Sequence, residues 1–199
     1  MNNEQKALYY FSKNPGIHRV SEILKAGIHH RTLYRLCDKG DVVKIGYGRY
    51  RFAMEEPVEN SSFAEIAERV PKGVFCLISA LDFFHIGTQM PIKHWLTLPK
   101  GAYKPKVHNY SIQYCLCSQK IFNIGIERHN IDGIDVKVYN PSKTVVDCFK
   151  YRNKIGIDVA IEALKESLRS KKSTIPEILR YAEVCRIRNV IMPYLEGIL

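Results

Sequence analysis

Hydrophobic and polar positions follow two different periods within the first 52 residues of this chain. From residue 4 to residue 38 the apolar positions recur every three or four residues, the period of an α-helix. Breaks at 14–16 and at Gly27 divide this stretch into three short helices. Between residues 42 and 52 apolar and charged positions alternate instead, as in two strands around the turn Gly46-Tyr47-Gly48. The pattern predicts two short helices joined by a tight turn and followed by a hairpin, which is a winged helix-turn-helix.

The helix that begins at residue 29 or 30 is predicted to have one apolar and one polar face. Leu33, Leu36 and Cys37 share one face at i, i+3, i+4 spacing. Helix-turn-helix proteins place the second helix in the major groove, where cationic and polar side chains reach base edges. The predicted groove contacts, on or near the opposite face, are His30, Arg31, Tyr34 and Arg35.

The predicted hairpin likewise has two unlike faces. On its return arm, alternation places Tyr50 and Phe52 on one face and Arg49 and Arg51 on the other. We expect the apolar face to pack on the helices and the cationic face to be left for phosphates. The residues expected to serve the wing and the phosphates are Lys44, Tyr47, Arg49 and Arg51.

The charge distribution favours a nucleic-acid partner for this region. The 199-residue chain has a net charge of +10, and residues 1–52 alone hold ten Lys and Arg against four Asp and Glu. More than half of the surplus therefore lies in about a quarter of the chain, as expected of a module that binds double-stranded DNA. A helix-turn-helix that binds another protein is the alternative.

The rest of the chain predicts a second, α+β domain. Residues 53–61 are acidic and polar, contain a proline and lack periodicity, so they are expected to form a linker. Helices, short strands and further helices follow, which predicts a mixed domain over 62–199 with a small antiparallel sheet and C-terminal helices. The expected strands are 95–99, 111–117, 124–131 and 134–139, and the expected helices are 62–69, 77–85, 141–151, 157–169, 175–185 and 189–198.

Several segments, in this order, resemble the AbiEi-type antitoxins over nearly the whole chain. They are the basic winged helix and the stretches CLISALDFFHIG, PIKHWLTLPKG, NIDGIDVKVYNPSKTVVDCFKYRNKIGIDVAIEALKESL and YLEGIL. Each is mainly a packing pattern, and their order and spacing together carry the resemblance.

The resemblance implies the antitoxin half of a bacterial toxin–antitoxin pair, some of which act in phage defence by abortive infection. It implies that the winged helix binds inverted repeats in its own promoter and represses the operon. It also implies that the C-terminal domain neutralises a nucleotidyltransferase-like toxin without a stable complex, as in type IV systems. A stand-alone winged-helix transcription regulator with a ligand-sensing or assembly domain is the alternative.

No motif in the chain predicts catalysis, and we expect no enzyme activity, metal or cofactor. Asp135 and Lys137 lie two apart on an expected strand, which is half of the acid-x-Lys arrangement of metal-dependent nucleases. Residues 83–126 contain no Asp or Glu to supply another acid, and Asp132 is accounted for by a hairpin turn with Gly133. A nuclease is therefore the disfavoured alternative.

The acid-free stretch itself has two interpretations. It carries five lysines, at positions 93, 100, 104, 106 and 120, interleaved with Trp95, Tyr103 and Tyr110. Basic and aromatic residues together suit a second nucleic-acid or nucleotide-binding surface. The alternative, which the sequence favours, is a solvated loop with Trp95 in the core.

The chain shows no signal peptide and no long apolar run, so we expect a cytoplasmic protein that does not enter a membrane. Its six cysteines lack metal-binding spacing and are expected to be reduced thiols. Since no heptad seam predicts an obligate dimer, we expect a monomer that binds DNA repeats cooperatively.

Overall fold

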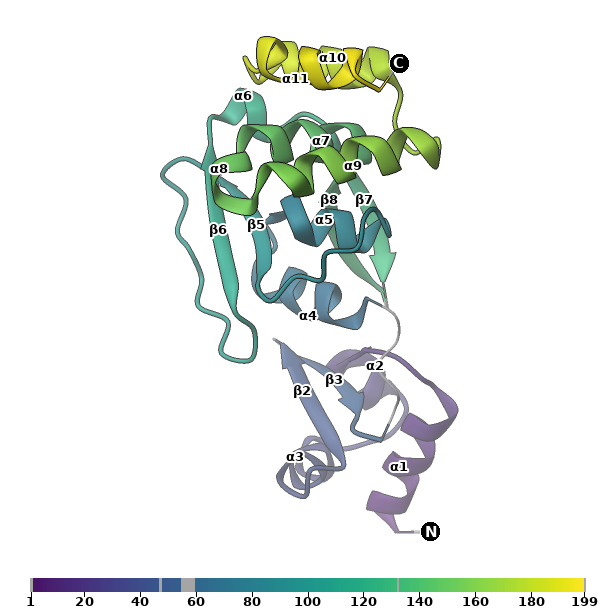
Figure 1. Cartoon of the computed structure of the whole chain (residues 1–199). Coiled ribbons are helices and arrows are strands. Elements are labelled where there is room, and N and C mark those ends of the chain that lie inside the picture. The colour runs from purple at the N-terminus through teal and green to yellow at the C-terminus, as the bar shows by residue number, and fades with distance from the viewer. Residues whose placement is uncertain (1, 47, 55–59, 132, 199) are drawn as a thin grey trace. The chain divides into compact units, whose positions relative to one another are not determined.

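The computed structural model describes residues 2–46, 48–54, 60–131 and 133–198. The chain divides into two compact units (Figure 1). The first comprises Met1–Pro71 with Asn130–Asp135, and the second comprises Lys72–His129 with Val136–Leu199.

The first unit has the expected winged-helix order of elements. Its three strands form a sheet in the order β1-β3-β2, in which both pairings are antiparallel. The elements are α1 (Asn3–Lys13), β1 (His18–Arg19), α2 (Val20–Lys25), α3 (His30–Asp38), β2 (Val42–Gly46), β3 (Arg49–Phe52) and α4 (Ser61–Arg69). The two-residue strand β1, which periodicity does not predict, adds a third strand to the hairpin.

A compact apolar core holds these elements together. Leu33 and Leu36 of α3 are fully buried with Phe11 of α1, Ile23 of α2 and Tyr50 of β3. The predicted apolar faces of α3 and of the hairpin are therefore confirmed. Burial of side chains this large supplies most of the driving force that fixes α3 against its neighbours.

Strand β2 departs from simple alternation. Its register against β3 shifts between Lys44 and Gly46, which is a β-bulge. Because the bulge inserts a residue, Val42 and Ile45 are both buried although they lie three apart, while Val43 is exposed. Regular alternation would have placed Val43 and Ile45 on the same face, and the bulge prevents this.

The boundary between the units also differs from the sequence-based division. Residues 55–59 of the expected linker lie outside the described residues. Helix α4, expected to begin the second domain, belongs to the first unit. It does so because its polar side chains bind the hairpin: Arg69 Nε donates a 3.0 Å hydrogen bond to the carbonyl of Ile45.

The second unit is built around a five-stranded sheet in the order β6-β5-β4-β8-β7, except that residues 130–131 and 134–135 of the last two strands belong to the first unit. Its strands are β4 (Val74–Phe75), β5 (His94–Pro99), β6 (Ile112–Cys117), β7 (Ile126–Ile131) and β8 (Ile134–Tyr139). Its helices are α5 (Leu77–Phe83), α6 (Gln119–Phe122), α7 (Pro141–Lys150), α8 (Arg152–Ile155), α9 (Ile157–Arg169), α10 (Ile175–Val184) and α11 (Arg188–Glu196).

This sheet is mixed, whereas a small antiparallel sheet was expected. Strand β4 pairs antiparallel with β5 but parallel with β8, and β5 pairs parallel with β6. The long connection over residues 100–111 makes the β5–β6 pairing possible, because it carries the chain back to the starting end of β5. Strand β4 was not predicted, since two residues are too few to show a period.

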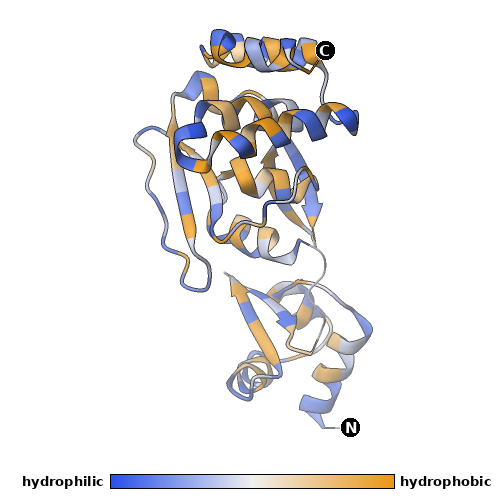
Figure 2. Ribbon diagram, in the orientation of Figure 1, coloured by the Kyte–Doolittle hydropathy of each residue, from blue (hydrophilic) through white to orange (hydrophobic). Residues whose placement is uncertain are grey.

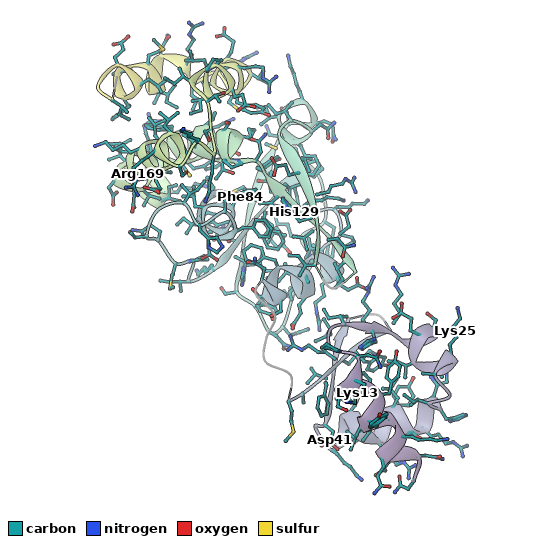
Figure 3. All side chains as sticks on the ribbon, turned by 90° about the vertical axis from the view of Figure 1, so that its right-hand side faces the viewer. Lys13, Lys25, Asp41, Phe84, His129 and Arg169 are labelled. Carbon is teal, nitrogen blue, oxygen red and sulfur yellow. The ribbon has the colours of Figure 1, made fainter. Side chains whose placement is uncertain are left out.

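Helices α5, α9 and α10 pack around α7, and the hydrophobic residues gather on these helices and on the strands (Figure 2). At the end of α5 the rings of Phe83 and Phe84 pack on His129 of β7, with centroids 4.8 Å and 5.8 Å away (Figure 3). The α+β class expected for the chain is confirmed.

A buried ion pair lies inside this core. Lys143 Nζ is 2.5 Å from Asp147 Oδ2, one helical turn along α7, and the two side chains are 1% and 7% exposed. The same ammonium lies 4.3 Å from the ring centroid of Tyr139, whose hydroxyl donates to the carbonyl of Phe122. Two charges removed from water in this way depend on each other, since either alone would be left in an apolar core.

We therefore predict that Asp147→Ala destabilises the protein by about 3–5 kcal/mol, because it leaves a buried ammonium without its carboxylate. Urea denaturation followed by circular dichroism measures the change. Glu183→Ala is the matched control: it removes one partner of an exposed pair with Arg188 and should cost less than about 1 kcal/mol. Equal losses of unfolding free energy in the two variants would contradict the conclusion that Asp147 neutralises a buried charge.

Candidate nucleic-acid interface

The solvent side of α3 carries the four residues predicted to enter the groove. Tyr34 is 53% exposed, and His30, Arg31 and Arg35 are exposed as well. At about 100° per residue these four side chains span about 140° of the helix. The structure thus brings them together on one continuous cationic and aromatic face.

Local contacts order the start of this face. His29 is the N-cap of α3, and its Nδ1 accepts a 3.3 Å hydrogen bond from the backbone N–H of Arg31. The rings of His30 and Tyr34 lie side by side one turn apart, with centroids separated by 6.1 Å. The helix therefore presents an ordered pair of rings beside Arg31.

Arg35, at the edge of the face, is oriented by α1. Its Nε lies 3.6 Å from Glu4 Oε1, and Lys39 Nζ lies 2.8 Å from Glu4 Oε2. The hydrogen bond from Lys39, together with the two positive charges, holds the pKa of Glu4 below its usual range. The Arg35 side chain remains 60% exposed, so it still reaches solvent from this position.

The hairpin residues are placed less uniformly. Lys44 is exposed on β2 beside the bulge. Tyr47 lies outside the described residues. Gly48 has a φ of 68°, and its carbonyl accepts a 2.6 Å hydrogen bond from the N–H of Val20. A side chain there would be strained and would approach Val20 Cγ1 to 3.3 Å, so glycine keeps this end of the hairpin close to α2.

The expectation that Arg49 and Arg51 face solvent together requires correction. Arg49 Nε lies 2.9 Å from Glu68 Oε1, and Arg51 Nη1 lies 3.4 Å from Glu65 Oε1. The two arginine side chains are only 12% and 16% exposed. This face of the hairpin is covered by α4 and neutralised by its carboxylates.

The sequence pattern did not predict these pairs, because the helix that carries Glu65 and Glu68 was expected to belong to the second domain. A signal was present: Glu65 and Glu68 stand at i, i+3 spacing, among buried residues of a largely apolar helix. Carboxylates in such a setting require cationic partners. Arg49 and Arg51 supply them from β3.

Asp135 and Lys137 occupy alternate positions of β8, as the strand pattern predicts, and Asp132 lies outside the described residues. Among the residues that the structure describes, no group of three or more His, Cys, Asp or Glu side chains could hold a metal ion.

All six cysteines are free thiols, and five are buried. In the described part of the chain, no helix is both long and apolar enough to cross a membrane.

Comparison with protein families decides what the N-terminal region resembles. Residues 5–53 match the family described as transcriptional regulator, AbiEi antitoxin. This region is therefore similar to the AbiEi antitoxin regulators. The match runs from α1 to the end of β3 and so includes the cationic face of α3 and the hairpin.

Solved structures extend the similarity to the fold of both units. The crystal structure of the RV2827C protein from Mycobacterium tuberculosis matches with a TM-score of 0.63 and 9% identity. The match covers 94% of this chain and 76% of that one. At this identity it shows a shared fold. No curated protein matches the chain.

We predict that Arg49 and Glu68 are coupled in stability. A double-mutant cycle of Arg49→Ala and Glu68→Ala, measured by thermal unfolding, should give an interaction of about 0.5–3 kcal/mol, because the pair is largely screened from water. Arg31→Ala, on the exposed face of α3, is the control and should change stability by no more than about 0.5 kcal/mol. A coupling of zero would mean that α4 does not hold the hairpin.

Proposed function

We propose that this protein is the antitoxin of a bacterial toxin–antitoxin pair and represses its own operon by binding double-stranded DNA. The exposed face of α3, which lies within the region similar to the AbiEi antitoxin regulators, carries the proposal. Cations and aromatic rings gather there, while the opposite face of the same helix is buried in the core. That division is the one a recognition helix needs.

Roles divide among the proposed contacts according to their placement. Arg31 and its neighbours His30, Tyr34 and Arg35 enter the major groove and read base edges. Lys44, which is exposed on β2, contacts the DNA backbone. Tyr47 lies outside the described residues and is assigned the same role from the sequence alone. Arg49 and Arg51 act as positioning residues, because their pairs with α4 hold the hairpin that carries Lys44.

The operator in this proposal is an inverted repeat in the protein's own promoter, bound cooperatively by monomers in the cytoplasm. The toxin partner is nucleotidyltransferase-like and is neutralised without a stable complex. The protein itself is not an enzyme and needs no cofactor or metal. The inverted repeat and the toxin partner follow the resemblance to AbiEi antitoxins, and the match over residues 5–53 supports the regulator part of it. The remaining statements rest on the sequence features described above.

We predict that removing a base contact and removing a phosphate contact have different effects on DNA binding. Arg31→Ala should lose about 1–3 kcal/mol of discrimination between the operator and a copy mutated at the contacted base. Lys44→Ala should weaken binding to both sequences alike and reduce the slope of log K against log salt by about one unit. Gel-shift titrations at several salt concentrations measure both quantities.

Lys13→Ala, an exposed cation at the end of α1, is the control for lost charge alone. It should leave discrimination unchanged. Equal, sequence-independent losses in Arg31→Ala and Lys44→Ala would contradict the division of roles.

We further predict that repression and toxin neutralisation separate genetically. A variant with Arg31→Ala and Arg35→Ala, expressed from an unrelated promoter with the cognate toxin, should still restore growth, because the resemblance assigns neutralisation to the C-terminal domain. The same variant should fail to repress a reporter driven by its own promoter. If the wild-type protein represses but never restores growth, the stand-alone regulator is the correct alternative.

A further inference from the structure

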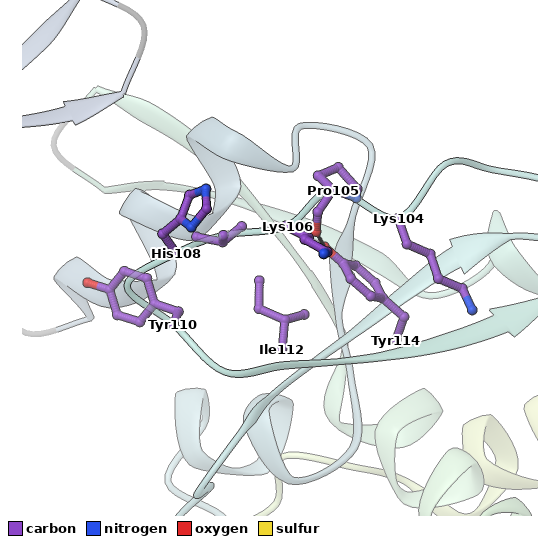
Figure 4. Close-up of a pocket in the computed structure, with 8 residues that line it drawn as sticks. Lys104, Pro105, Lys106, His108, Tyr110, Ile112 and Tyr114 are labelled. Carbon is purple, nitrogen blue, oxygen red and sulfur yellow. Dashed lines mark hydrogen bonds between the residues drawn. The ribbon is translucent and has the colours of Figure 1, made fainter.

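The long connection between β5 and β6 encloses a hollow in the second unit that the proposed repressor function does not use. The hollow has a volume of about 420 Å³, within the size range of small-molecule sites in proteins, and Figure 4 shows the residues that line it. We call it the β5–β6 hollow. It is lined by Lys104, Pro105, Lys106, Val107, His108, Tyr110, Ile112 and Tyr114.

Specific contacts shape this hollow. The hydroxyl of Tyr114, on β6, donates a 2.6 Å hydrogen bond to the carbonyl of Pro105 and so ties the connection to the strand. Val107 is buried, and its carbonyl accepts from the N–H of Tyr110. The ring of Tyr110 packs edge-on against His94 of β5, at 5.5 Å between centroids. These contacts hold the connection against β5 and β6.

The rim of the hollow is cationic. Lys104, Lys106 and His108 are exposed, and no Asp or Glu occurs anywhere between residues 83 and 126. Within the described parts of the chain, neither Lys104 nor Lys106 has a carboxylate at ion-pair distance. This differs from the hairpin, where α4 neutralises both arginines. Uncompensated ammonium groups beside a hollow attract an anion.

The wall of the hollow is aromatic and apolar. Tyr110, Ile112 and Tyr114 are half-buried and line it together. Tyr103, directly before Lys104 in sequence, is 81% exposed but does not line the hollow. Trp95 packs against the core and contributes nothing here. A flat apolar surface next to paired cations is the combination that holds a base and its phosphates.

We propose that the β5–β6 hollow binds a single-stranded nucleic acid, with separate bases against Tyr110 and Tyr114, which lie on either side of Ile112, and with phosphates on Lys104 and Lys106. This site is separate from α3 and requires a different form of nucleic acid. A duplex keeps its bases stacked inside the helix, so side chains in a hollow cannot reach the base faces, whereas an unpaired base can be splayed out onto tyrosine rings.

The test uses the full-length protein and a short oligothymidylate with one central 2-aminopurine, whose fluorescence changes when the base stacks. Tyr110→Leu should weaken binding by about fivefold to 150-fold, the range measured for loss of one stacked base. Tyr110→Phe keeps the ring and should bind as the wild type does. Thermal unfolding of each variant confirms that the second unit remains folded.

The lysines are tested by salt dependence. Lys104→Ala with Lys106→Ala should reduce the slope of log K against log salt by about 1.4, at about 0.7 for each phosphate contact on a single strand. The matched control is Lys93→Ala with Lys120→Ala, which removes two exposed lysines of the same acid-free stretch that do not line the hollow. The control should leave both slope and affinity unchanged.

Repeating the titration with Arg31→Ala on α3 separates this site from the winged helix, because binding by the hollow should persist in that variant. Equal affinity for a duplex of the same sequence, without a fluorescence change, would overturn the proposal. So would equal losses in the control lysine pair, or competition by a free mononucleotide as strong as that by the oligonucleotide.

Discussion

Burial of one side of α3 is the constraint that determines which residues this helix exposes. Leu33 and Leu36 are fully enclosed by α1, α2 and the hairpin, so the helix cannot rotate without exposing them to water. That fixes His30, Arg31, Tyr34 and Arg35 on the solvent side together. Glu4 of α1 and the N-cap His29 then refine the positions of Arg35 and Arg31. The cationic face is thus a consequence of core packing.

A second constraint determines which cations remain available. The three cations of the hairpin, Lys44, Arg49 and Arg51, looked equivalent by charge and alternation. In the structure α4 engages Arg49 and Arg51 through Glu68 and Glu65. Partly buried pairs of this kind contribute to the shape of the hairpin, while Lys44 stays exposed. In the second unit the lysines of the connection before β6 stay accessible, because no Asp or Glu lies near them in sequence. Whether a cation is paired within the protein or remains accessible therefore depends on the Asp and Glu residues near it, more than on the net charge of the chain.

The sequence predicted what depends on local periodicity. The winged-helix order, the two faces of α3 and most helix positions in the second unit agree with the structure, since each follows from a repeated pattern within one element. The failures concern pairings between distant segments. The two-residue strands β1 and β4 are too short to show a period, and the parallel β5–β6 pairing depends on how a long connection runs. The bulge at Ile45 and the α4–hairpin pairs arise only when neighbouring segments meet.

A footprint of the purified protein on the DNA upstream of its own gene shows whether α3 reads an operator. We expect a protected inverted repeat, with protection lost when Arg31→Ala is used at the same concentration. We also expect Lys13→Ala, which removes an exposed cation of α1, to protect the same bases as the wild type. Protection without sequence preference, or an unchanged footprint with Arg31→Ala, would contradict the assignment of α3 as the element that reads the operator.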